Sequence, residues 1–196
     1  MLKVGITGGI GSGKTTVCKI FELLGIPFYS SDKAAQVLME NHEELRSKII
    51  FHFGKSAYHQ SKLNKTWLTQ NVFTVPQKLN LLNSLVHPIV LIDSQDWMKR
   101  QTSAYAIKES ALIFESNAFQ YLDQVIGVAA PKALRIVRSM SRNKISMKEV
   151  LLRMERQMAE SKKLRMCDFI LVNNEKKLLI PQILELHEKL LHLSHS

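Results

Sequence analysis

Residues 8–15 read GGIGSGKT and decide how this chain of 196 residues folds. The segment fits the pattern GxxxxGK followed by Ser or Thr, in which glycines let backbone amides approach an anion closely. Five of the eight glycines in the chain fall within its first thirteen residues. Such a cluster, in a sequence otherwise poor in glycine, predicts a loop that binds the phosphates of a nucleoside triphosphate.

The residues on either side place this loop between a strand and a helix. Residues 2–7 are mainly apolar and include β-branched side chains, which is typical of a short buried strand. Apolar side chains then recur at helical spacing, at Val17, Ile20, Phe21 and Leu24. A helix N-terminus offers unpaired amides and the positive end of its dipole to a phosphate. We expect the nucleotide to contact Gly8, Gly9, Ile10, Gly11, Ser12, Gly13, Lys14, Thr15 and Thr16.

Two side chains of this loop have distinct expected roles. Lys14 is expected to reach the β- and γ-phosphates, and the hydroxyl of Thr15 to bind Mg²⁺. The phosphate loop predicts that the protein binds a nucleoside triphosphate, but it does not identify the molecule that receives the phosphate.

The composition is that of an ordinary globular domain, with 45% hydrophobic and 22% charged residues. No apolar run approaches the roughly 18–20 residues of a membrane span, and the N-terminal residues lack the layout of a secretory signal peptide. Cys18 and Cys167 are far apart and show no metal-binding spacing. We therefore expect a cytoplasmic protein with reduced thiols and no membrane partner. We also expect it to be monomeric or weakly oligomeric.

The net charge of +10 is concentrated in one segment. Residues 131–165 contain eleven Lys or Arg and three Glu, a balance of +8. Such a segment can bind nucleic acid, form a solvated helical face, or clamp phosphates, and composition alone does not choose among these. The phosphate loop in the same chain favours the clamp. The lack of interleaved aromatic residues argues against a surface that stacks single-stranded bases.

Strands that alternate with helices predict an α/β fold, in which a five-stranded parallel sheet has helices on both faces. The expected strands are 2–7, 27–31, 105–113, 124–130 and 169–173. The expected helices are 14–24, 33–53, 78–101, two within 131–165, and 176–193, whereas 54–76 is expected to be irregular. Two segments, 33–84 and 131–165, are too long or too charged to be simple crossovers. Ligands bind beyond the carboxyl ends of the strands in such sheets, so we expect both segments to project there.

The order of motifs along the whole chain resembles that of the dephospho-CoA kinases. The likeness runs through GITGGIGSGKTTV (5–17), LGIPFYSSD (24–32), FHFG (51–54), LNSLVHP (82–88), ALIFE (111–115), RIVRSMSR (135–142), RMERQ (153–157) and DFILVNN (168–174). This resemblance implies a P-loop kinase that transfers the γ-phosphate of ATP, with Mg²⁺, to the ribose 3′-hydroxyl of dephospho-CoA. It also implies a core of residues 1–32, 85–130 and 166–196, a helical CoA-binding domain at 33–84, and a small basic lid at 131–165.

Asp32 follows the second expected strand. Its carboxylate is suited to orienting or deprotonating an attacking hydroxyl, or to holding Mg²⁺ through water. It is equally suited to capping a helix that starts at Lys33, and the residues alone leave the catalytic and the capping role open. The resemblance implies the catalytic role, because Asp32 matches the second, functional aspartate of a pattern that is commonly Asp-Ala-Asp in the family. It also shows a departure, because Ser30 occupies the position of the first aspartate.

Arg138 and Arg142 are four residues apart and so share one helical face. A guanidinium group matches phosphate oxygens geometrically, although a solvated basic face is the commoner role of such a pair. The resemblance implies that both are lid arginines that bind ATP and that Arg138 takes part in catalysis. Arg153 and Gln157 are expected only to orient the lid.

Three further residues have a structural and a functional interpretation. His87, before Pro88, either marks a helix end or lies beside the acceptor. Glu115 is either a carboxylate at a helix N-terminus or a contact to the acceptor. Asn173 either belongs to a turn or contacts adenine. The resemblance implies the functional role for each of them.

We therefore predict a dephospho-CoA kinase that uses ATP and Mg²⁺ and has no nucleic-acid partner. The alternative is a P-loop kinase for a nucleoside monophosphate or another small hydroxyl substrate. A nucleotide-gated nucleic-acid binder is a third possibility, suggested only by the basic segment. A GTPase is disfavoured because the sequence contains no DxxG or NKxD string.

Overall fold

The computed structural model describes residues 1–195, without the side chain of Asn143. The chain forms two compact units, one made of Met1–Tyr29 together with the chain from Met98 onward, the other of Ser30–Trp97. The expected roles of a core, an acceptor-binding domain and a lid remain predictions.

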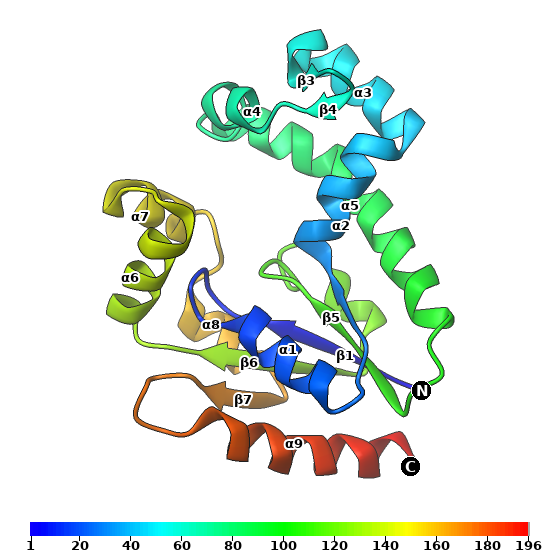
Figure 1. Cartoon of the computed structure of the whole chain (residues 1–196), viewed down its shortest axis with the longest axis vertical. Helices are drawn as coiled ribbons and strands as arrows, with labels where there is room; N and C mark the ends of the chain where they lie inside the picture. Colours follow the sequence, from blue (N-terminus) through cyan, green and yellow to red (C-terminus); the bar gives the residue numbers. More distant parts are fainter. Residues whose placement is uncertain (196) are drawn as a thin grey trace. The chain divides into compact units, whose positions relative to one another are not determined.

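The first unit is built on a five-stranded parallel sheet, as predicted (Figure 1). Its strands, in spatial order, are β2 (Phe28–Ser30), β5 (Tyr105–Glu109), β1 (Leu2–Thr7), β6 (Gln124–Ala129) and β7 (Phe169–Val172). The central strand β1 pairs in parallel with β5, where Val4 is opposite Ile107, and with β6, where Ile6 is opposite Ile126. After β1 the chain adds β2 and β5 on one side of it and then β6 and β7 on the other. The loop after β1 therefore lies where the strand order reverses.

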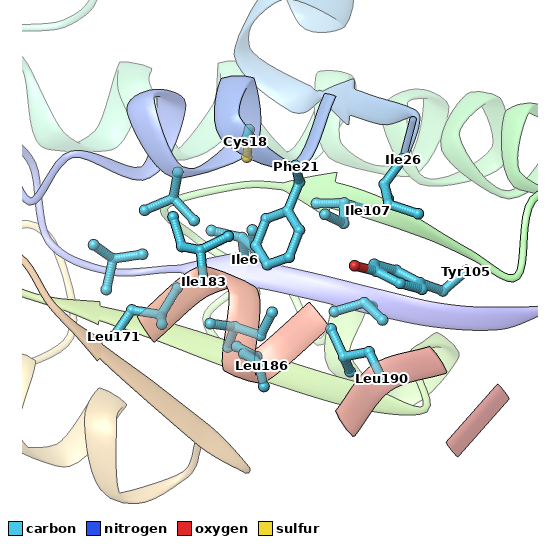
Figure 2. Close-up of a cluster of buried hydrophobic side chains, with 14 residues drawn as sticks. Ile6, Cys18, Phe21, Ile26, Tyr105, Ile107, Leu171, Ile183, Leu186 and Leu190 are labelled. Carbon is cyan, nitrogen blue, oxygen red and sulfur yellow. The ribbon is translucent and has the colours of Figure 1, made fainter. Parts of the chain in front are cut away.

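One face of this sheet is covered by α1 (Lys14–Leu23) and α9 (Leu179–Ser194). Figure 2 shows the apolar core between them and the strands. The ring of Phe21 meets that of Tyr105 edge-on at 6.2 Å, and the Tyr105 hydroxyl is 2.6 Å from Nδ1 of His187. Each fully buried apolar side chain of this core stabilises the fold by about 1.5–3 kcal/mol relative to an exposed one. This packing fixes α1, and with it the loop that α1 follows.

The other face of the sheet packs against α8 (Glu160–Arg165) and a smaller apolar cluster. Gly127 of β6 points to this side, where an added Cβ would lie 2.8 Å from Leu164 and 2.9 Å from the sulfur of Cys167. Ile113, Phe114 and Val125 form the cluster beside it. The sheet is therefore covered on both faces, as predicted.

The basic segment forms three helices, where the sequence predicted two. They are α6 (Lys132–Asn143), α7 (Met147–Glu155) and α8. A capping box starts α7, since the Ser146 and Glu149 side chains each accept from the other's backbone amide. Pro131 is the N-cap of α6.

The second unit is mainly helical. It contains α2 (Ser31–Asn41), α3 (Glu43–Phe53), α4 (Lys65–Asn71) and α5 (Pro76–Lys99), with a short 3₁₀ helix at Lys55–Ala57 and a hairpin of β3 (Tyr58–His59) and β4 (Lys62–Leu63). Leu45, Ile49 and Leu68 are fully buried. The single helix predicted over 33–53 is wrong, because the extended backbone of His42 (φ −83°, ψ 107°) separates two helices. The segment 54–76 was also predicted wrongly as irregular, since the 3₁₀ helix, the hairpin and α4 lie in it.

Within the part of the chain that the structure describes, no helix combines the length and apolar character needed to cross a membrane.

Candidate active site

The loop between β1 and α1 has a backbone that requires glycine. Gly11 and Gly13 have φ angles of 77° and 98°, in the left-handed region that side chains with a Cβ rarely adopt. Space imposes the same requirement, because a Cβ on Gly13 would collide with the side-chain amide of Asn173. Gly13 is also the N-cap of α1, so the unpaired amides of the first helical turn directly follow the left-handed residues of the loop.

Lys14 opens α1 and is buried. Its ammonium group donates to the carbonyl oxygens of Gly8, at 3.1 Å, and Gly9, at 3.4 Å. The charge therefore lies directly over the loop, where phosphate oxygens are expected. Thr15 is half-buried and Thr16 is exposed in the same first turn of the helix.

Two amide side chains from later in the chain hold the loop. The Ile10 backbone amide donates to Oε1 of Gln157 at 3.0 Å, and Nδ2 of Asn173 donates to the Ser12 carbonyl at 2.9 Å. Gln157, expected from the sequence only to orient the lid, thus contacts the phosphate loop itself.

Several buried polar atoms around this loop have no hydrogen-bond partner among the described residues. They include the hydroxyl oxygens of Thr7, Ser12 and Ser139. Buried polar groups are nearly always hydrogen-bonded in proteins, so such a cluster suits a strongly polar ligand. Amides, a lysine and hydroxyls fit phosphate oxygens, and the Thr15 hydroxyl fits Mg²⁺, which prefers oxygen ligands.

The structure brings Arg138 and Asn173 together. One guanidinium nitrogen of Arg138 donates to the Asn173 carbonyl at 3.1 Å, and another pairs with the carboxylate of Glu175 at 2.9 Å. Glu175 has a φ of 64°, in the left-handed region that glycine favours. Arg142, one turn further along α6, is exposed.

Glu115 is paired within the first unit. Its Oε1 accepts from the Met158 amide at 2.8 Å and from the ammonium of Lys163 at 2.9 Å. Lys163 is fully buried and also donates to the Ala111 carbonyl. These contacts tie the loop after β5 to the basic segment, and a contact between Glu115 and the acceptor remains a prediction.

The end of β5 places two buried charged residues beside the loop. Burial lowers the pKa of Lys108 to about 8. Burial raises the pKa of the Cys18 thiol, the nearby Glu109 carboxylate raises it further, and Lys14 opposes the shift. Cys18 therefore stays protonated and packs in the apolar core. Strand β5 ends at Glu109, four residues before the predicted end.

Asp32 and His87 belong to the second unit. Asp32 is exposed in the first turn of α2, whose N-cap is Ser30, so the alternative role of Asp32 as a cap is wrong. His87 is half-buried in α5, and Pro88 lies inside this continuous helix rather than at its end. The roles of Asp32 and His87 toward an acceptor remain predictions.

A parallel sheet of this order, with a GxxxxGKT loop between its central strand and a helix, defines the P-loop kinase class. The family model for dephospho-CoA kinase matches residues 2–178. The chain therefore belongs to the dephospho-CoA kinase family.

Individual relatives agree with this assignment. The chain is 33% identical to the dephospho-CoA kinase of Bacteroides fragilis over 186 residues, which cover 94% of this chain and 91% of that protein. It is similar to a crystal structure from Thermus thermophilus, with 30% identity and a TM-score of 0.80 over 97% of this chain and 96% of that one. It is also similar to dephospho-CoA kinase from Campylobacter jejuni, with 25% identity and a TM-score of 0.69 over 95% and 96%.

Sequence reasoning missed Glu160 and Lys163, and it left Arg135 without a role. The sequence carries only a weak signal for these residues. Segment 131–165 contains eleven basic residues and three acidic ones, and Glu160 is one of the three. An acidic residue in so basic a segment is a candidate for a specific ion pair. Its partner could not be chosen from the sequence.

Proposed function

We propose that this protein is an ATP-dependent kinase that phosphorylates the ribose 3′-hydroxyl of dephospho-CoA and releases coenzyme A and ADP. The observation that carries this proposal is the phosphate loop, with the Lys14 ammonium over it, in a chain of the dephospho-CoA kinase family. We further propose a cytoplasmic location, a monomeric or weakly oligomeric state, and no nucleic-acid or membrane partner.

Each site residue has a proposed role in this reaction. The amides of the phosphate loop and Lys14 bind the β- and γ-phosphates, and Thr15 holds Mg²⁺, which neutralises phosphate charge when bound. Arg138 and Arg142 bind the triphosphate, with Asn173 beside the adenine. Asp32 orients or deprotonates the 3′-hydroxyl, and His87 and Glu115 position the acceptor. Catalysis of this kind rests on positioning and charge stabilisation.

The acceptor is tested by comparing dephospho-CoA with AMP, CMP and adenosine at a fixed concentration of Mg·ATP. Dephospho-CoA carries a pantetheine arm, whose binding energy can help orient the reacting hydroxyl. We therefore expect kcat/KM to be highest for dephospho-CoA by at least about a hundredfold, with truncated acceptors losing kcat as well as affinity. Mass spectrometry should show a phosphate on the ribose 3′ position. A preference for AMP or CMP, with a diphosphate as the product, would favour the alternative nucleoside monophosphate kinase.

The basic segment is tested through Arg138. Replacing Arg138 by alanine removes a bidentate phosphate donor and should raise the KM for ATP roughly tenfold. Adding Mg·ATP to the unmodified protein should slow hydrogen exchange in residues 131–165. The matched control is Lys148→Ala, which removes an exposed positive charge from α7 of the same segment and should leave the KM for ATP unchanged.

A nucleic-acid role for the same segment predicts a different pattern. Binding to DNA or RNA would weaken steeply as salt rises, because phosphate contacts release counterions. If Arg138→Ala abolished such binding while ATP turnover was unchanged, the assignment of this segment to ATP would be wrong.

A further inference from the structure

An ion pair borders the phosphate loop and has no part in the reaction as proposed above. Arg135 of α6 and Glu160 of α8 pair at 2.6 Å between Nη2 and Oε2, with side chains only 8% and 19% exposed. A Cβ on Gly9 would collide with Nη1 of Arg135 and would lie 3.5 Å from Oε1 of Glu160. Both partners therefore lie against the same residue of the loop.

The backbone of α6 lies against the loop as well. A Cβ on Gly11 would collide with the Arg135 carbonyl and lie 2.6 Å from Oγ of Ser139. The carbonyl of Gly9 accepts from the Lys14 ammonium at 3.4 Å. Gly9 therefore lies against the Arg135 guanidinium and also contacts the amine proposed to bind the phosphates, so it links the two groups.

The position of Glu160 is electrostatically unfavourable for a triphosphate site. Its carboxylate is half-buried, and burial raises its pKa, against the opposing effects of Arg135, Lys163 and Lys14. A negative charge near Lys14 repels phosphates, and a buried carboxylate persists only when it is paired. Its observed partners are the Arg135 guanidinium and the Ala130 backbone, and of these only Arg135 is a charged group that a carboxylate here would hold in place.

We propose that Arg135 and Glu160 are positioning residues, which hold Gly9, and through it Lys14, in the geometry that phosphoryl transfer requires. This inference rests on the proposed kinase function. It adds a residue pair that acts through the loop rather than on the phosphates. A small misplacement of a positioned group can reduce a rate by about a hundredfold, so the pair is expected to have a measurable effect.

The test uses Arg135→Gln, Glu160→Gln and the double variant of the full chain. We measure the affinity for Mg·ATP by calorimetry without acceptor, then kcat and KM for each substrate, and the melting temperature. Each single variant should lower kcat/KM for ATP by roughly tenfold or more and leave the KM for dephospho-CoA nearly unchanged. Because the two residues act as a unit, the double variant should be no worse than the poorer single variant. The matched control is Lys189→Gln, which breaks the exposed Lys189–Glu185 pair of α9, 2.7 Å long.

The sign of the Glu160→Gln effect separates positioning from direct charge. If Arg135 served the phosphates by charge alone, removing the nearby carboxylate would tighten ATP binding. Tighter binding, or unchanged kinetics, in Glu160→Gln would overturn the proposal. If the glutamine variants do not fold, Arg135→Lys keeps the charge and loses the planar fork, and an unchanged rate in that variant would overturn it too.

The same experiment distinguishes this inference from the proposed function. If the unmodified protein does not phosphorylate dephospho-CoA, the proposed function fails, while the affinities for ATP still test the pair. If the unmodified protein is active and the three variants match it, the pair has no positioning role.

Discussion

Replacing Lys14 by alanine is expected to lower the rate of phosphoryl transfer by about 10²–10³-fold, the range found when one preorganised donor to a developing charge is removed. The ammonium lies over the loop, where it donates to the carbonyls of Gly8 and Gly9. Phosphoryl transfer shifts negative charge among the oxygens of the transferred and leaving phosphates, and the Lys14 ammonium is placed to stabilise it. The rate is measured as coenzyme A formed at saturating Mg·ATP.

The fold should survive this change, because Lys14 contacts the loop and is not part of the apolar core. Circular dichroism and thermal melting of Lys14→Ala should therefore resemble those of the unmodified protein. Lys19→Ala is the matched control, since it removes an exposed lysine from the same helix and should keep the full rate. A folded Lys14→Ala protein that turned over normally would contradict the assignment of the phosphate loop.

The loop and the sheet could be predicted from the sequence because both depend on local patterns. The GxxxxGKT string specifies the backbone of residues 8–15, and the left-handed φ angles of Gly11 and Gly13 agree with it. Val4, Ile6, Ile107 and Ile126 lie on strands that were recognised from short apolar runs. Alternation of such strands with helices leaves few topologies other than a parallel sheet.

The contacts that complete the site could not be predicted, because they join residues far apart in the sequence. Asn173 donates to Ser12 across 161 positions, and Glu115 meets Lys163, which the sequence presents as one of many surface lysines. The pairing of Arg135 with Glu160 depends on how α6 and α8 pack, which no local pattern records. The break at His42 was missed although its signals are local, because Asn41 is a common residue at a helix end and Glu43 and Glu44 lie in the first turn of α3, where the His42 side chain accepts from the Leu45 amide.

Replacing Asp32 by asparagine is expected to lower kcat by roughly 10²–10⁴-fold, the usual contribution of a general acid or base. Asparagine keeps the size of the side chain and removes its charge. Asp32 is exposed in the first turn of α2, where a carboxylate also favours the helix dipole. Loss of that effect alone costs about 0.3–1 kcal/mol of stability, so the melting temperature should fall only slightly.

Glu43→Gln separates the two roles of such a carboxylate. Glu43 is an exposed acidic residue in the first turn of α3, so its replacement removes the same dipole effect from the neighbouring helix. This control should lose a similar amount of stability and retain its full kcat. If Asp32 acts on the acceptor hydroxyl, Asp32→Asn instead loses kcat while its affinity for ATP, measured without acceptor, is unchanged. An Asp32→Asn protein with the kcat of the unmodified enzyme would show that Asp32 contributes only to the start of α2, and that another group orients the hydroxyl.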